Sequence, residues 1–167
     1  MNNYNHCNNF RSPLAAVLLR RPNASAKVRP ALNGLVNGYV NFYQTNCGVL
    51  VMAEISNLPS NRENCGRNVF GFHIHEGMRC SGNSEDPFAD AMGHYNPGNC
   101  EHPHHAGDMP PLFENGGHAF SVFLTDRFTV NEVIGRTVII HSKPDDFTTQ
   151  PSGDSGSKIA CGIIRKY

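Results

Sequence analysis

The sequence predicts a single all-β domain, folded as a β-sandwich or barrel. Its 16 glycines and 11 prolines divide the 167 residues into short apolar segments. Several segments alternate apolar with polar side chains, which is the period of a half-buried strand, and no window carries a sustained helical repeat. Seven or more short strands separated by turn residues are typical of sandwiches and barrels. The length suits one domain with a sizeable core.

Each expected strand has its own pattern. Residues 14–19 form a short apolar run. Every second side chain from Val36 to Phe42 falls on one face of residues 35–43, and the same holds from Val49 to Ile55 in residues 49–55. The only helical feature we expect is a short turn over residues 131–135. The remaining strands are expected at residues 69–75, 119–124, 137–141 and 159–164.

The chain divides into a polar N-terminal extension, residues 1–13, and one domain, residues 14–167. Two connections are longer than a hairpin needs, residues 76–117 and residues 142–156. Each begins directly after a strand that ends in histidine. Because long structureless loops in compact domains are usually functional, we expect both loops to build the site.

Composition excludes several classes of function. The 14 basic and 14 acidic side chains give a formal net charge of zero, so neither a nucleic-acid nor a membrane-surface partner is indicated. No apolar run approaches the roughly 20 residues that span a bilayer. The first residues have no basic start and no apolar centre, so we expect no signal peptide and a cytoplasmic location.

Two histidines on one expected strand open a cluster of candidate metal ligands. His73 and His75 are two residues apart, so their side chains point to the same face, roughly 7 Å apart. Phe72 and Ile74 then point to the opposite face, towards the core. A half-solvated strand could carry two such histidines without a metal, but that explanation leaves the further matching positions unexplained.

The first long loop supplies the next candidates. It carries His94, His102, His105 and Asp108, and three histidines with one aspartate form a suitable tetrahedral zinc set. His104 could replace His105, although we expect it to be a solvent-exposed neighbour. Imidazoles at this density are a poor way to build a core, and neutral imidazole binds both copper and zinc.

His141 ends a strand and precedes Asp145 and Asp146. Alone, such a residue is more often an ordinary surface histidine. A carboxylate four residues further on can hydrogen-bond the free nitrogen of a metal-bound imidazole; alternatively, the two aspartates simply start a turn. Six histidines and one aspartate in this pattern predict a two-metal site.

Taken together, these residues make the chain similar to the copper–zinc superoxide dismutase family from Leu14 to Ile164. Residues 71–76 resemble the family's first copper motif, residues 135–141 the strand with its last copper ligand, and residues 160–164 its closing strand. The resemblance implies an immunoglobulin-like Greek-key sandwich or barrel of about eight strands. It implies an oxidoreductase that converts superoxide to oxygen and hydrogen peroxide by Cu(II)/Cu(I) cycling.

The resemblance also implies roles for single residues. The copper ligands it implies are His73, His75, His94 and His141, and the zinc ligands it implies are His94, His102, His105 and Asp108. His94 would bridge copper and zinc ions and deliver a proton, and Asp145 would link a copper histidine to a zinc histidine. The alternative is a non-catalytic copper- or zinc-binding protein of the same fold, and the complete ligand set argues against it. The partners implied are superoxide and, for some members, a second copy in a homodimer.

The chain has six cysteines, which allow 15 complete pairings, and the residues alone do not choose among them. The resemblance pairs Cys80 with Cys161 in a disulfide. It leaves Cys7, Cys47, Cys65 and Cys100 outside that bridge. A reducing cytoplasm would work against the disulfide.

Three features depart from the family pattern. Lys158 stands where members usually carry an arginine three residues before the last cysteine. Lysine keeps the charge that attracts superoxide but lacks the planar fork of arginine, so we expect lowered activity with Lys158 as the guiding residue. Only two residues separate His102 from His105, which constrains the zinc geometry. The final loop, residues 142–157, offers few charges, so steering of the substrate must be local.

Overall fold

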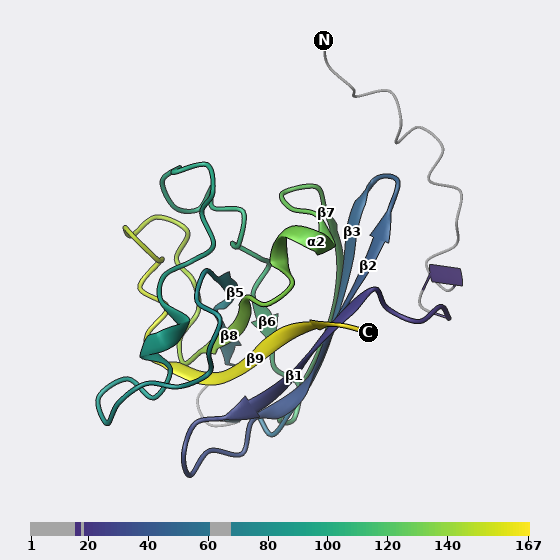
Figure 1. Cartoon of the computed structure of the whole chain (residues 1–167). Coiled ribbons are helices and arrows are strands. Elements are labelled where there is room, and N and C mark those ends of the chain that lie inside the picture. Colours follow the sequence, from purple (N-terminus) through teal and green to yellow (C-terminus); the bar gives the residue numbers. More distant parts are fainter. Residues whose placement is uncertain (1–15, 18, 61–67) are drawn as a thin grey trace.

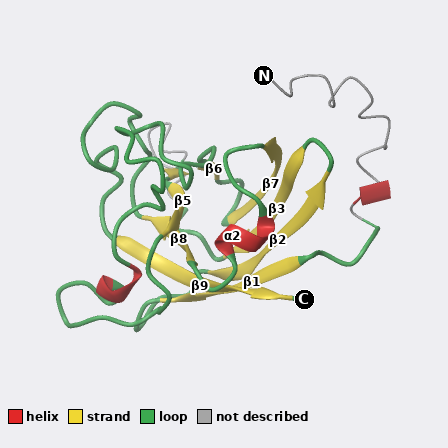
Figure 2. Ribbon diagram, turned by 45° about the horizontal axis from the view of Figure 1, so that its top comes forward, coloured by secondary structure: helices red, strands yellow, loops and turns green. Residues whose placement is uncertain are grey.

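A seven-stranded antiparallel sheet curls into a half-barrel (Figures 1 and 2). The structure, a computed structural model, describes residues 16, 17, 19–60 and 68–167. The order in this sheet is β5-β8-β9-β1-β2-β3-β7, and β4 pairs with β6 in a second sheet. The strands are β1 (Ala24–Pro30), β2 (Asn37–Thr45), β3 (Gly48–Ser56), β4 (Val69–Phe70), β5 (Phe72–His75), β6 (Leu112–Phe113), β7 (His118–Thr125), β8 (Thr137–His141) and β9 (Lys158–Lys166). The predicted all-β class is confirmed.

The strand order explains where the long loops lie. Because β5 and β7 are the two edge strands of the large sheet, the connection between them runs from one edge to the other. This connection carries the short 3₁₀ helix η2 (Ala89–Ala91) and strand β6. The second long loop joins β8 to β9, which are neighbours in the sheet. Both loops therefore begin at the β5–β8 edge, where the candidate histidines end their strands.

The core fills the inside of the curled sheet. Phe42, Phe70, Phe72 and Ile74 are among its largest fully buried side chains. Strands β2 and β3 pair in continuous register from their ends to the turn that joins them, and they bury alternate side chains as predicted. None of the helices among the described residues has the length and hydropathy needed to span a bilayer.

One expectation for the N-terminal part was wrong, and one strand there was missed. The described residues of segment 14–19 are helical or in a turn and not extended, and Val17 packs on Tyr43 and Leu50 at the outer face of the sheet. Strand β1 was missed, because small alanines at inward positions give a weak strand signal. The expected extension, residues 1–13, lies outside the described residues. The expected short turn appears as the helix α2 (Val130–Val133).

The strand expected over residues 69–75 is broken at Gly71 into β4 and β5. A Cβ atom at this glycine would lie 2.9 Å from the side chain of Ser155 and 3.3 Å from the Cβ of His141. The Gly71 N–H donates to the carbonyl of Lys143, and its own carbonyl accepts from the His141 N–H. The missing side chain thus lets the final loop approach the start of β5.

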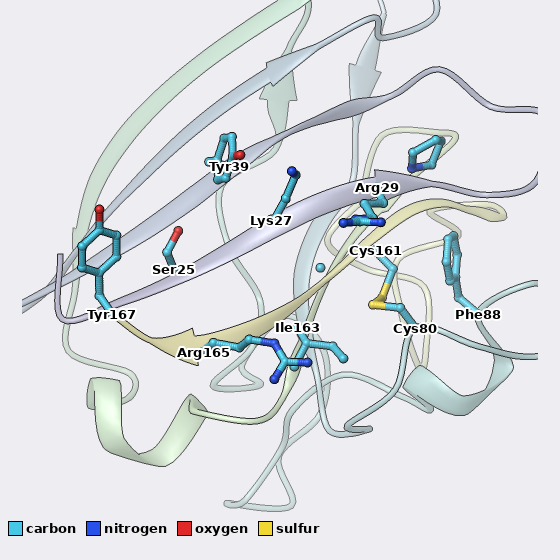
Figure 3. A pocket seen from close by; sticks show the side chains of 12 residues that line it. Ser25, Lys27, Arg29, Tyr39, Cys80, Phe88, Cys161, Ile163, Arg165 and Tyr167 are labelled. Carbon is cyan, nitrogen blue, oxygen red and sulfur yellow. A yellow bond between two sulfur atoms is a disulfide. The ribbon is translucent and has the colours of Figure 1, made fainter.

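A disulfide joins Cys80 in the first long loop to Cys161 in β9, which confirms the expected pairing (Figure 3). It packs with Phe88, Ala91 and Ile139 in a small second hydrophobic cluster. The bridge closes a separation of 81 residues. Loop-closure entropy alone then predicts a stabilisation of about 4.5 kcal/mol.

Removing this bridge should lower the free energy of unfolding by up to about 4.5 kcal/mol. The change is Cys80→Ser combined with Cys161→Ser, and the measurement is the urea unfolding curve of the metal-free protein. Cys100→Ser is the matched control, because Cys100 is exposed and lies outside the bridge. Equal midpoints for the double variant and the control would show that the bridge adds no stability.

Candidate metal centre

Strand β5 delivers two histidines to one buried face. His73 and His75 alternate with Phe72 and Ile74, as the sequence predicts, but all four side chains are buried. His73 is 0% exposed and His75 only 2%. The histidine face is therefore not the solvated side of the sheet. It is covered by the long loops, which bring further polar residues against it.

Backbone pairing adds the first long loop to β5 as if it were further strand. Isolated bridges place His73 opposite Asp108 and His75 opposite His94. The N–H of Ile74 donates to the carbonyl of Gly107 at 2.9 Å, and the carbonyl of Ile74 accepts from the N–H of Tyr95 at 2.8 Å. The loop ligands are thus set by main-chain hydrogen bonds and not by side chains alone.

Four histidines form the first group of converging ligand atoms: His73, His75, His94 and His141. In three of them, the ring nitrogen that faces away from the group (the outer nitrogen) donates a hydrogen bond to a protein oxygen. His75 Nδ1 donates to the Met92 carbonyl at 2.8 Å and His141 Nδ1 to the Gly156 carbonyl at 3.2 Å. The inner nitrogens then carry lone pairs, and the Nε2 atoms of His75 and His141 face each other at 3.2 Å. Two lone pairs at this distance need a cation between them.

The second group of converging atoms belongs to His94, His102, His105 and Asp108. The Asp108 carboxylate lies 2.7 Å from His94 Nδ1, 3.1 Å from His102 Nδ1 and 3.4 Å from His105 Nδ1. His104 is exposed, as expected. His94 belongs to both groups, and its ring centroid lies 3.9 Å from that of His73 and 5.5 Å from that of His105.

Asp145 connects the two groups. Its carboxylate accepts from His73 Nε2 at 2.7 Å and from His102 Nε2 at 2.9 Å. Burial would raise the pKa of this carboxyl group, but these hydrogen bonds and one from the Phe147 N–H outweigh it and hold the pKa at about 2. Both alternatives for this pair are therefore observed: Asp145 hydrogen-bonds the ligand histidines, and Asp146 accepts from two backbone N–H groups in a turn.

Three buried histidines of the first group, His73, His75 and His141, are neutral at pH 7. Burial lowers the pKa of His73 to about 4, although the hydrogen bond to Asp145 opposes the shift. Burial, helped by the neighbouring His73, lowers the pKa of His141 to about 3. The pKa of His75 is lowered well below its ordinary value for the same first reason. Neutral imidazole is the form that binds copper and zinc.

Buried nitrogens without partners test whether metal ions fit. Four ring nitrogens are buried with no hydrogen-bond partner, and all four belong to the two groups: His73 Nδ1, His94 Nε2, His102 Nδ1 and His105 Nδ1. An unsatisfied buried polar atom costs about 1–3 kcal/mol. One cation bound in each group would satisfy all four nitrogens. Nitrogen ligands with one carboxylate are suited to zinc, and imidazole ligands are suited to copper.

A cavity of about 670 Å³ opens over the first group and is lined by His75, His94 and His141. Lys158 also lines it, and its Nζ contacts the Asp86 carboxylate at 2.6 Å and the Phe88 carbonyl at 3.2 Å. A second groove of similar volume lies beside the disulfide and contains none of the metal-ligand candidates (Figure 3). The cavity at the histidines leads to the first group of the candidate metal centre.

Sequence reasoning missed the residues that hold the predicted ones in place. Asp86 pairs with Lys158 across 72 positions, and Arg127 contacts the loop that carries His102 and His105. Gln150 hydrogen-bonds both the N–H and the carbonyl of His102. None of these has a local sequence signal, because each partner lies far away along the chain.

Known proteins match this chain over most of its length. The model of the copper/zinc superoxide dismutase family matches residues 36–164. The chain belongs to this family. Cu-Zn superoxide dismutase 1 of Aquifex aeolicus is 36% identical over 145 residues, 77% of this chain and 79% of the relative. Cu-Zn superoxide dismutase 2 of the same organism is 35% identical, over 79% of this chain and 81% of the relative.

A solved structure agrees with the sequence matches. The Cu/Zn superoxide dismutase of Brucella abortus superposes with a TM-score of 0.71 at 26% identity, over 84% of this chain and 98% of that one. Members of the family are oxidoreductases that act on superoxide, and the two buried groups fit copper and zinc. The predicted family, enzyme class and cofactors are confirmed.

The metal-free protein should lose stability as the pH falls below about 6.5. Unfolded histidines have a pKa of about 6.5, whereas His73 and His141 have pKa values of about 4 and about 3 in the fold. The unfolded chain therefore binds more protons in this window, and stability rises with pH across it. Below about pH 4 the loss continues, because Asp145 is held at a pKa of about 2.

Urea unfolding midpoints of the metal-free protein, measured at intervals between about pH 7.5 and 4.5, check this dependence. His104→Ala is the control, since His104 is exposed and should leave the profile unchanged. A midpoint that stays constant across the window would contradict the buried neutral histidines.

Proposed function

We propose that this chain disproportionates superoxide at a copper ion bound by His73, His75, His94 and His141, beside a zinc ion bound by His94, His102, His105 and Asp108. The observation that supports the assignment most strongly is the set of four buried ring nitrogens without partners. All of them belong to these seven residues. No other group of the described residues offers three or more converging ligand atoms of this kind.

When bound, copper supplies a one-electron couple, so two superoxide anions and two protons give one oxygen molecule and one hydrogen peroxide. The protein fixes the geometry around that couple. The carbonyls of Met92 and Gly156 hold the rings of His75 and His141, and the carboxylate of Asp145 holds His73. Each holds the outer N–H and so keeps the inner nitrogen deprotonated.

His94 is the proposed proton donor. Its Nδ1 is directed at Asp108, and its Nε2 points to the first group without a hydrogen-bond partner. His94 also lines the cavity and is 6% exposed. A proton held at Nε2 therefore lies beside the cavity through which peroxide would leave. Asp108 holds the opposite side of the ring in place while that proton is transferred.

Lys158 is the proposed guide for the anion. It is a lining residue of the cavity, but Asp86 neutralises part of its charge, and Glu76 and Glu85 line the same cavity. Lys143, the lysine two residues after His141, pairs with Asp154 at 3.4 Å on the surface and does not line this cavity. Steering is therefore weak, and the catalytic rate should change little with ionic strength.

The alternative of a non-catalytic metal-binding protein is not favoured. A storage or structural site needs no access for a small anion, whereas three of the proposed copper ligands line an open cavity. The cytoplasmic location stays a prediction. So does the homodimer, for which the exposed Phe120 and Leu124 on the edge strand β7 offer an apolar surface.

Ligand substitutions test the assignment. His141→Ala should abolish copper binding and superoxide consumption and keep zinc, because His141 contributes only to the first group. His105→Ala should lower the zinc content and keep one copper. His104→Ala is the matched control. Metal content by mass spectrometry and superoxide consumption after reconstitution are the measurements, and full activity of copper-loaded His141→Ala would contradict the proposal.

Removing the guiding charge should lower kcat/KM for superoxide by at most about fivefold at low salt, since two unit charges about 4 Å apart in water interact by about 1 kcal/mol and Asp86 already neutralises part of the charge. The variant is Lys158→Ala, and Lys143→Ala is the control because its partner lies outside the cavity. Pulse-generated superoxide decay measures the rate. Equal loss in both variants would show that net charge, not the position of Lys158, matters.

A further inference from the structure

A single arginine holds three carbonyl groups of the proposed zinc loop. Nη1 of Arg127 donates to the carbonyl oxygens of Pro103 at 3.1 Å, His105 at 3.2 Å and Asp108 at 3.2 Å. One of these carbonyls belongs to the residue after His102, and the other two belong to proposed zinc ligands. The guanidinium thus contacts the backbone of the segment that must curl around the metal.

The backbone that carries Arg127 is held firmly by the main sheet. Arg127 lies two residues after the end of β7, which pairs with β3 in continuous register over eight residues. Its own N–H donates to the Thr125 hydroxyl at 3.2 Å. The next residue, Phe128, is buried and packs edge-on against Phe42, with ring centroids 6.4 Å apart. The arginine therefore connects the main sheet to the loop.

Within the loop of residues 102–108, β5 holds Gly107 through the Ile74 N–H at 2.9 Å, and the Gly107 N–H donates to the Tyr95 carbonyl at 2.8 Å. The rest of the loop has few restraints of its own. Its internal hydrogen bonds are short-range: the Asp108 N–H donates to the His105 carbonyl at 3.2 Å, and the His105 N–H donates to the Asp108 carboxylate at 3.0 Å. Gln150 holds the His102 end from the final loop. Without Arg127, the carbonyls of the His105–Asp108 end would lose a charged donor.

We propose that Arg127 is a positioning residue that presets the zinc-binding geometry of residues 102–108 and so sets the affinity for zinc. This inference rests on the proposed assignment of His102, His105 and Asp108 to zinc. Arg127 contacts none of the proposed copper ligands. Three of those ligands lie on β5 and β8, which are held by the sheet itself. The effect is therefore on zinc and not on copper.

The test compares Arg127→Met, Arg127→Lys and Arg165→Met. Methionine keeps much of the length and removes every donor. Lysine keeps the charge and part of the hydrogen bonding but not the fork. Arg165 is an exposed arginine on β9, remote from the histidine cavity, and serves as the matched control for the loss of one positive charge.

Zinc affinity of the full, metal-stripped chain is measured by competition with a chelator, and copper affinity is measured in parallel. Cobalt(II) serves as a probe of the zinc site, because its visible absorption is intense only in tetrahedral geometry. We expect Arg127→Met to weaken zinc binding about 10- to 100-fold, the usual effect of losing a residue that orients metal ligands. The cobalt spectrum should also weaken, Arg127→Lys should be intermediate, and copper affinity should be unchanged.

Two results would overturn the role of Arg127. One is an unchanged zinc affinity and cobalt spectrum in Arg127→Met. The other is an equal loss of zinc and copper affinity together with a lowered urea midpoint, which indicates a general structural role. If Arg127→Met does not fold, wild-type zinc affinity and cobalt spectrum in Arg127→Lys would equally contradict the need for the guanidinium.

His105→Ala in the same titration separates this inference from the function on which it rests. Zinc binding that does not change in His105→Ala contradicts the ligand assignment itself. Zinc binding that is lost in His105→Ala and kept in Arg127→Met contradicts only the role of Arg127.

Discussion

The carboxylate of Asp145 brings together three parts of the chain. It accepts hydrogen bonds from His73 on β5, from His102 in the first long loop and from the N–H of Phe147 in the final loop. The two bonds from the histidines satisfy buried donors that would otherwise lack a partner. Because the donors fix both rings, the lone pairs at His73 Nδ1 and His102 Nδ1 are directed inward. One ionised side chain therefore orients one histidine of each group.

The sequence predicted the parts of the site that have a local pattern. The alternation of β5 placed His73 and His75 on one face, and β8 has the predicted bounds, so these strands could be found from their own residues. It did not predict that the histidine face is buried, because burial is created by loops that arrive from elsewhere. For the same reason, Asp86 gave no signal as the partner of Lys158, since only tertiary packing brings them to 2.6 Å.

The setting of Lys158 shows a compromise between position and charge. A lysine side chain is flexible, so a contact with a carboxylate and a carbonyl is an effective way to hold it at the cavity. The same contact weakens the positive potential that an anion meets, and the acidic residues nearby weaken it further. Arginine can be held by neutral carbonyls through part of its fork and still offer donors to an anion. Lysine here obtains its fixed position by accepting partial neutralisation.

The compact zinc loop is held mainly by contacts from outside it. A longer loop could support its ligands through its own turns, but residues 102–108 have little room for such contacts. Instead, Arg127 fixes the loop from the end of β7, and Gln150 and Asp145 fix it from the final loop. The final loop therefore contacts both the zinc loop and β5. Asp145 links His102 of the second group to His73 of the first, which is a second connection between the two groups besides the shared His94.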